Sequence, residues 1–326
     1  MKTETMLGLM ILGIIISVVL AGLRILLLIR QDFRSKLDLI GTISMGIAAA
    51  FAVFSFAIWC DQAVQILQWT AKGYDEYQIR QGLSNPTTFK NIFAGDFATL
   101  GALWFPKVAF LAAYSPAYRA FEKKLRLLFH ITIAVTILTF VGSIATFVFY
   151  CFPVSRNWDL TPPKGTEMCI IVVIWNPIFI ACLLNIISDI FVLAVPVVAL
   201  LQIPGPKSRT QRFGVGAIIG LGILSIGMSF YRMLGAKLDG YTNGKLLPIG
   251  ERNWHIIGNL IMVVSSLIAF SLPSLRALVR KRLKNNRSRF TGTVSSEDQQ
   301  HLGIGLGRAE SWKAANLARI QSSSRF

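Results

Sequence analysis

Residues 6–28 read MLGLMILGIIISVVLAGLRILLL, and Arg24 is the one charged side chain in this stretch. An α-helix rises ~1.5 Å per residue, so ~20 apolar residues cross the ~30 Å hydrocarbon layer of a bilayer. Six further apolar runs of similar length follow, separated by short polar stretches: Leu39–Trp59, Phe93–Tyr114, Leu127–Phe149, Ile170–Leu201, Phe213–Leu234 and Trp254–Leu275. The pattern predicts an all-α, polytopic membrane protein, a seven-transmembrane-helix bundle over residues 1–275.

The composition of the chain agrees with this prediction. Hydrophobic residues make up 53% of the 326 residues, and the mean hydropathy of +0.56 exceeds what a soluble domain of this size normally carries. Helices that are apolar on all sides would expose that surface in water, whereas a bilayer favours helices whose backbone groups are satisfied internally. The first run is also longer than the core of a secretory signal, so we expect an uncleaved anchor.

Basic residues gather in alternate loops of the predicted bundle. They lie after the first, third, fifth and seventh runs: Arg30, Arg34, Lys36; Arg119, Lys123, Lys124, Arg126; Lys207, Arg209, Arg212; Arg276, Arg280, Lys281, Arg282, Lys284, Arg287 and Arg289. Cytoplasmic loops accumulate Lys and Arg, so this bias predicts an outside or lumenal N-terminus and a cytoplasmic C-terminus. The formal net charge of +17 then lies mostly on one side, which favours contact with anionic inner-leaflet lipids over nucleic acid.

Two further segments follow the membrane domain. Residues 276–290 combine Leu and Val with many basic side chains. This segment either lies along the interface as an amphipathic helix or is an ordinary basic flank of the last span. Residues 291–326 are rich in Ser, Gly and Gln, a composition that predicts a disordered cytoplasmic tail.

Cysteine positions suggest a bridge in the second outer loop. Cys151 and Cys169 bracket this loop, and Cys60 sits at the outer end of the second run. An oxidising exterior permits a disulfide between Cys151 and Cys169. A bridge from Cys60 to either of them, or free thiols, are the alternatives.

Short motifs also occur in a fixed order along residues 24–276. They are Arg30, Arg34 and Asp38 before the second run; Lys107 to Tyr114 in the third; Cys151, Pro153, Trp158 and Cys169 in the outer loop; Asn185, Asp189 and Pro196 in the fifth; Phe213, Gly216, Ser229 and Arg232 in the sixth; and Pro273, Leu275 and Arg276 at the end of the seventh. In order and spacing they resemble the fungal rhodopsin-like family of seven-helix integral membrane proteins. The resemblance implies either a receptor-like protein or one encoded beside a secondary-metabolite pathway.

No cofactor is expected from these residues. A retinal Schiff base needs a lysine, and the seventh run, Trp254–Leu275, contains neither a lysine nor a carboxylate. We therefore expect no retinal and no light-driven pumping, despite the family name. The histidines lie far apart in the sequence, so we expect no metal site either: His130, His255 and His301.

Charged side chains inside the apolar runs mark the candidate site, because charge in the bilayer is costly and usually faces a partner or a cavity. They are Arg24, Asp96, Lys107, Asp189 and Arg232. Lys107 and Asp189 lie at similar depth within their apolar runs, so we expect the flexible lysine to pair with Asp189. Asn185 and Asp189 are four residues apart and share a helix face, so we expect Asn185 to lie beside the pair. This group, with Asp96 and Arg232, either forms a ligand-binding polar core or merely orients the helices.

Two functions fit these observations, and the receptor is favoured. The first is a receptor-like protein that binds a small apolar ligand and contacts lipid or a cytoplasmic signalling partner through its basic inner loops. The second is a membrane-embedded biosynthetic enzyme of the cyclase type, in which Asp189 or Asp96 acts as general acid. An Asp that already pairs with a lysine lacks the proton that this second function requires.

Overall fold

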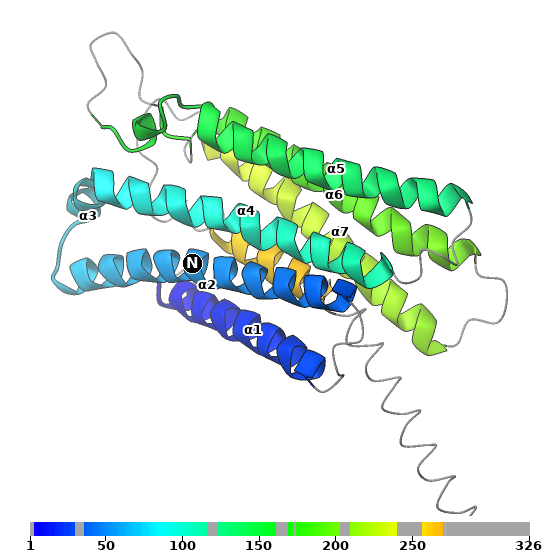
Figure 1. Cartoon of the computed structure of the whole chain (residues 1–326). Coiled ribbons are helices and arrows are strands. Elements are labelled where there is room, and N and C mark those ends of the chain that lie inside the picture. Colours follow the sequence, from blue (N-terminus) through cyan, green and yellow to red (C-terminus); the bar gives the residue numbers. More distant parts are fainter. Residues whose placement is uncertain are drawn as a thin grey trace, which may run out of the picture. The chain divides into compact units, whose positions relative to one another are not determined.

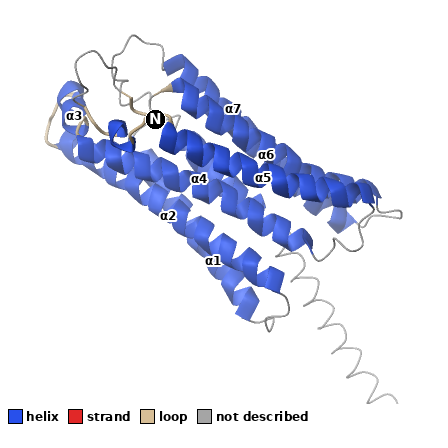
Figure 2. Ribbon diagram, turned by 45° about the horizontal axis from the view of Figure 1, so that its top comes forward, coloured by secondary structure: helices blue, strands red, loops and turns tan. Residues whose placement is uncertain are grey.

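The computed structural model describes residues 3–29, 36–115, 123–160, 169–171, 174–202, 209–239, 256–269 and 271. Their regular secondary structure is entirely helical (Figure 2). In chain order the helices are α1 (Thr3–Ile29), α2 (Lys36–Ala71), α3 (Glu76–Leu83), α4 (Pro86–Tyr114), α5 (Lys123–Phe149), the 3-10 helix η2 (Val154–Asn157), α6 (Trp175–Gln202) and α7 (Arg209–Asp239). A further apolar helix covers Ile256–Ala269.

Within the described residues, five helices are long and apolar enough to cross a membrane: α1, α2, α4, α5 and α6. The protein is therefore an all-α integral membrane protein with several spans, which confirms the predicted fold class. Ile219–Leu234 within α7 and helix Ile256–Ala269 are shorter apolar helices, so the count of seven spans stays a prediction. The basic segment 276–290 and the tail 291–326 lie outside the described residues.

Helix α2 continues well beyond the apolar run that predicted it. The run ends at Trp59, whereas the helix ends at Ala71. Its end is a Schellman motif, in which Gly73 adopts a left-handed φ of 80° that glycine tolerates without steric cost. Gly73 N–H donates to Thr70 O at 3.0 Å and Tyr74 N–H donates to Trp69 O at 3.2 Å. These bonds reverse the chain and direct it into α3.

Helix α3 packs against the extension of α2 through a glycine. A Cβ atom at Gly82 would lie 1.9 Å from Cη2 of Trp69, so the indole ring occupies the space that any side chain would need. The chain then enters α4 through an N-cap, in which Asn85 Oδ1 accepts a 2.8 Å bond from Thr88 N–H and Pro86 is the first helical residue. Together these contacts fix the end of the bundle at which α1 begins.

Helix α4 is the central helix, packed between α2 and α5 (Figure 1). In its apolar window 72% of the residues are buried, against 22% in α1 and 28% in α5. Small residues let α2 approach α4 closely: Gly95 faces Ile58, and a Cβ at Gly101 would lie 2.6 Å from the Phe51 ring. Close approach over small residues is a usual means of helix association in membranes.

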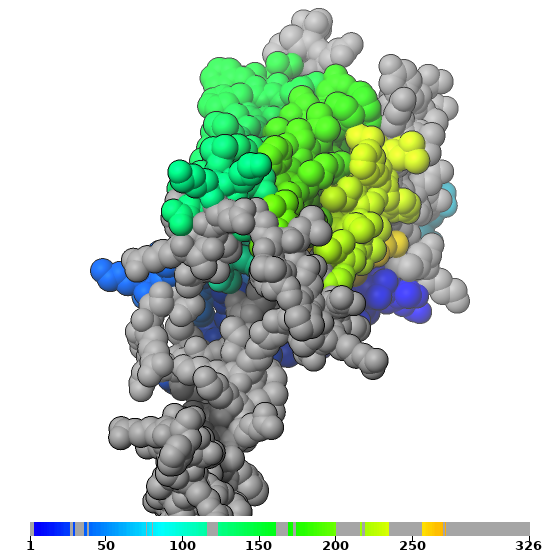
Figure 3. All heavy atoms as spheres, turned by 90° about the vertical axis from the view of Figure 1, so that its right-hand side faces the viewer, coloured from blue at the N-terminus to red at the C-terminus, as the bar shows by residue number. Residues whose placement is uncertain are grey.

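The outward faces of the bundle are strongly apolar. On α1 and α5 the exposed side chains are mostly Ile, Leu and Val, with Leu138 on α5 70% exposed and Val19 on α1 59% exposed. Helices α5, α6 and α7 lie side by side on another face (Figure 3). In water such surfaces would be unfavourable, whereas hydrocarbon solvates them. These faces are the lipid contact of the protein.

We expect the contact between Trp69 and Gly82 to tolerate no added methyl group. Gly82→Ala should destabilise the protein by about 1–3 kcal/mol, because the indole ring must move. Gly46→Ala on α2 is the matched control, since a Cβ there meets no atom within 4 Å and Ala favours helix by up to ~1 kcal/mol over Gly. Thermal unfolding in detergent measures both variants, and equal midpoints for them would contradict the packing described.

Candidate functional site

An ion pair in the interior joins α4 to α6. Lys107 Nζ lies 2.9 Å from Asp189 Oδ1, and both side chains are almost completely buried. A single charge at the centre of a membrane helix costs at least ~2.5 kcal/mol on insertion scales, and a partner of opposite charge offsets that cost. The structure thus brings together the two charges that the sequence places deepest in the apolar runs.

The ammonium group of Lys107 has further partners on α6 and α4. It donates a 2.8 Å hydrogen bond to Asn185 Oδ1 and also contacts the hydroxyl of Ser188. It lies 4.7 Å from the ring centre of Trp104, one turn earlier on α4, where the face of the indole attracts a cation. These contacts engage the ammonium group on several sides.

The second carboxylate oxygen of Asp189 connects α6 to α7. Asp189 Oδ2 accepts bonds from Asn185 Nδ2 at 3.2 Å and from Ser225 Oγ at 3.0 Å. Asn185 Nδ2 also donates to Ser229 Oγ at 3.1 Å, and Ser229 Oγ lies 3.7 Å from the Met262 sulfur. We call Lys107, Asn185, Ser188, Asp189, Ser225 and Ser229 the polar core. It links α4, α6 and α7, and Met262 extends it to helix Ile256–Ala269.

Helical spacing explains why these side chains meet. Residues three and four apart lie on the same face of a helix. Asn185, Ser188 and Asp189 therefore form one polar patch on α6, and Ser225 and Ser229 form another on α7. Ser188 and Ser225 were not predicted as site residues from the sequence, although a serine pair four residues apart in an apolar helix is a signal for the α7 patch.

The other predicted site residues lie elsewhere in the bundle. Asp96 precedes Lys107 by eleven residues on α4, which places it about 16 Å away along the helix axis. It is buried, and its Oδ1 lies 3.5 Å from Asn259 Nδ2. Arg232 is also buried, one turn beyond Ser229 on α7, and packs near Gly258. Asp96 and Arg232 thus lie apart from the ion pair.

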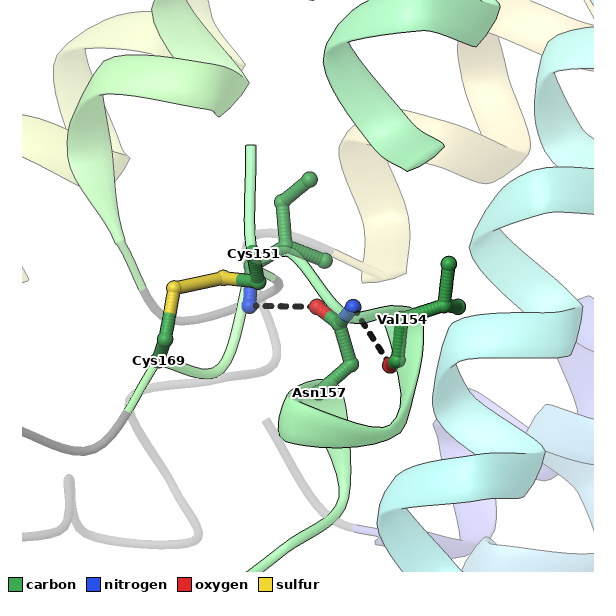
Figure 4. The surroundings of a disulfide bond; sticks show 5 residues. Cys151, Val154, Asn157 and Cys169 are labelled. Carbon is green, nitrogen blue, oxygen red and sulfur yellow. Dashed lines mark hydrogen bonds between the residues drawn. A yellow bond between two sulfur atoms is a disulfide. The ribbon is translucent and has the colours of Figure 1, made fainter. Parts of the chain in front are cut away.

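A disulfide joins the segment after α5 to the segment before α6. Cys151 and Cys169 are bonded, with their Cα atoms 5.6 Å apart (Figure 4). The buried side chain of Asn157 holds the same region, since its Nδ2 donates to Val154 O at 3.0 Å and its Oδ1 accepts from Ile171 N–H at 3.2 Å. The other two cysteines have free thiols: Cys60 and Cys182.

Residues 151–160, which we call the bridged segment, rest on the end of the bundle where α4 begins. Trp158 packs edge-on against Phe93 of α4, with ring centres 5.8 Å apart. Lys90 Nζ lies 5.6 Å from the centre of the Trp158 ring. The disulfide therefore restrains a segment that covers this end of α4.

Comparison with known proteins gives one family match. The family model of the fungal rhodopsin domain matches residues 38–281, which include the polar core and the disulfide. No curated protein and no solved structure matches the chain.

Removing one partner of the buried pair should destabilise the protein more than removing both. Lys107→Met and Asp189→Asn should each cost about 3 kcal/mol or more, since each leaves a buried charge without its partner. The double variant should lose less stability than either single variant. Thermal unfolding in detergent measures the cycle, with Lys124→Met on the exposed start of α5 as a charge-matched control. Additive losses would mean that the two charges do not interact.

Proposed function

The chain belongs to the fungal rhodopsin domain family, and from that premise we propose that it is a receptor-like membrane protein that binds a small ligand without retinal. The observation that carries the proposal is the engagement of both carboxylate oxygens of Asp189 in the polar core. That engagement takes up Asp189, one of the two candidate acids of the competing function, a membrane-embedded cyclase.

A cyclase of this type needs a carboxyl group that holds a proton and reaches its substrate. Lys107 lies at one oxygen of Asp189, while Asn185 and Ser225 donate to the other. Each carboxylate oxygen of Asp189 thus already has a partner within the protein. The arrangement supports a role in binding or in coupling helices better than it supports acid catalysis.

The polar core is suited to transmitting a shift of one helix to the others. Its hydrogen bonds join α4, α6 and α7, so a shift of one helix must break or replace bonds to the others. A ligand can shift the helices only if it binds one arrangement of them more tightly than another. In this proposal, Lys107, Asn185 and Asp189 couple the helices, and Asp96 and Arg232 contribute a second polar site at another depth.

Retinal does not fit this arrangement of lysines. Among the described residues, Lys107 is the one buried lysine. Its amino group is held by Asp189, Asn185 and Ser188, whereas a Schiff base requires an amine that is free to condense with an aldehyde. The proposed ligand is therefore bound without a covalent bond to lysine.

We also propose seven spans with the basic ends in the cytoplasm. Helix α7 and helix Ile256–Ala269 would supply the sixth and seventh spans. Helices α2 and α5 begin at the same end of the bundle (Figure 1), where Lys36, Lys123 and Lys124 are exposed. Basic residues at that end favour anionic inner-leaflet lipids and a cytoplasmic signalling partner.

The receptor and the enzyme differ in what happens to the bound compound. The gene is deleted, and the lipid-soluble extract of the deletion strain is incubated with purified protein in phospholipid nanodiscs. Untargeted mass spectrometry then compares the extract before and after incubation. We expect compounds to be retained by the protein and recovered unchanged.

The control for this experiment is the double variant Asp96→Asn/Asp189→Asn. Conversion of any compound by the wild-type protein, but not by this variant, would contradict the receptor and support the cyclase. Retention of a compound without conversion supports the receptor. If no compound is retained and none is converted, the result would argue against a ligand-binding function.

A further inference from the structure

A cavity lies at the end of the bundle where α1 begins. Its volume is about 60 Å³, and residues of α1, α2, α3, α4 and helix Ile256–Ala269 line it. Segments far apart in the sequence thus meet around one space, and the space is partly open to the outside of the bundle. Ligand sites in helical bundles are commonly found in such clefts between helices.

The described lining of the cavity is mostly apolar. Met6 and Met10 come from α1, Trp59 and Ile66 from α2, and Ile256 from the last described helix. Methionine adapts its shape readily to irregular apolar ligands. Among the residues that the structure describes, no Asp, Glu, Lys or Arg lines the space, so an ionised ligand would find no counter-charge from them. The chemistry of the lining favours a neutral, largely apolar compound.

One polar group at the cavity wall, Gln62 Nε2, has no hydrogen-bond partner in the part of the chain that the structure describes. Nε2 of Gln62 on α2 is buried and has no hydrogen-bond partner among the described residues, and Gln62 lines the cavity. Buried amide donors are nearly always hydrogen-bonded, because leaving one unpaired is unfavourable. A carbonyl oxygen of a ligand would satisfy this donor.

The size of the cavity limits the ligand. A cavity needs roughly 10–15 Å³ to hold one water molecule, and a dry apolar cavity of about 150 Å³ holds benzene. The space near Gln62 thus takes only a few non-hydrogen atoms, and a longer ligand must extend through the opening. We infer that this cavity binds a small neutral carbonyl compound, with its oxygen at Gln62 Nε2 and its aliphatic body along Met6 and Met10. The inference rests on the proposed ligand-binding function and names its site.

The cavity also lies next to the bridged segment. Met6, Met10 and Trp59 belong to a buried apolar cluster with Ile92 of α4 and Ile170, the residue after Cys169. A ligand in the cavity therefore contacts side chains that pack against the disulfide region. Binding should hold α1 and the bridged segment together.

Photolabelling tests this site directly. The probe is an aliphatic ketone that carries a diazirine and an alkyne tag, added to the protein in phosphatidylcholine nanodiscs. Peptide mapping locates the label, and excess 2-octanone or n-octane serves as competitor. We expect saturable labelling on the stretches of α1 and α2 that line the cavity. 2-Octanone should compete for it at least about tenfold better than n-octane, the gain of roughly one hydrogen bond.

Two variants of α2 distinguish binding through the Gln62 amide from nonspecific apolar binding of the probe. Gln62→Leu replaces the amide by an apolar side chain of similar size and should weaken labelling about tenfold. Gln68→Leu, at an exposed position of the same helix, should leave labelling unchanged. Unchanged thermal midpoints show that both variants are folded. Equal competition by ketone and alkane would overturn the assignment of a carbonyl ligand.

The remaining outcomes distinguish this inference from the proposed function. Competed labelling elsewhere in the bundle, for instance near Lys107, would overturn this cavity as the site and leave the receptor proposal standing. Labelling of the lipid-facing side chains of α1 and α5 that neither competitor reduces would also overturn the site. The receptor proposal itself is decided by the conversion assay with the cell extract, which does not depend on the ketone probe.

Discussion

The burial of the Lys107 ammonium group inside a membrane bundle is the constraint on which the interior of this protein depends. A charge in hydrocarbon must find partners, and Lys107 finds a carboxylate, an amide oxygen, a hydroxyl and an indole face. Satisfying Asp189 in turn requires Asn185 and Ser225. The registers of α4, α6 and α7 are thereby tied to one another, because a shift of one helical turn would separate all these groups.

The helices differ in how much they contribute to packing and to polar contacts. Helix α4 carries the lysine and is the most buried of the five long apolar helices, with small residues facing α2. Helices α1 and α5 expose apolar faces to lipid. Hydrophobic burial does little to drive helix association in a bilayer, since lipid tails are as apolar as the side chains. Close packing over Gly95 and Gly101 and the hydrogen bonds of the polar core therefore supply specificity that a soluble protein would obtain from its apolar core.

The sequence alone predicted the fold class and the family, and both are confirmed. Apolar runs are a direct signal because bilayer thickness dictates their length. The extension of α2 to Ala71, helix α3 and the fit of Trp69 against Gly82 could not be predicted from hydropathy. The reason is that those residues lie beyond the apolar run and their conformation depends on local caps and on one close contact.

The candidate site was only partly predictable from the sequence. Lys107, Asn185 and Asp189 are conspicuous because polar groups are rare in apolar runs. Ser188 is not, because a single serine occurs freely in membrane helices, and the one sequence signal for Ser225 is its spacing of four residues from Ser229. The cavity beside Gln62 has no sequence signature at all, since five separate segments form it.

The most direct test of this account is a distance measurement between Lys107 and Asp189 in a lipid bilayer. Solid-state NMR on protein with ¹⁵N-labelled lysine and ¹³C-labelled aspartate detects dipolar coupling between Nζ and Cγ. We expect a strong coupling that disappears in Lys107→Met and corresponds to a separation within about 4 Å, as in an ion pair. The absence of any coupling that depends on Lys107 would contradict the central role of the buried pair.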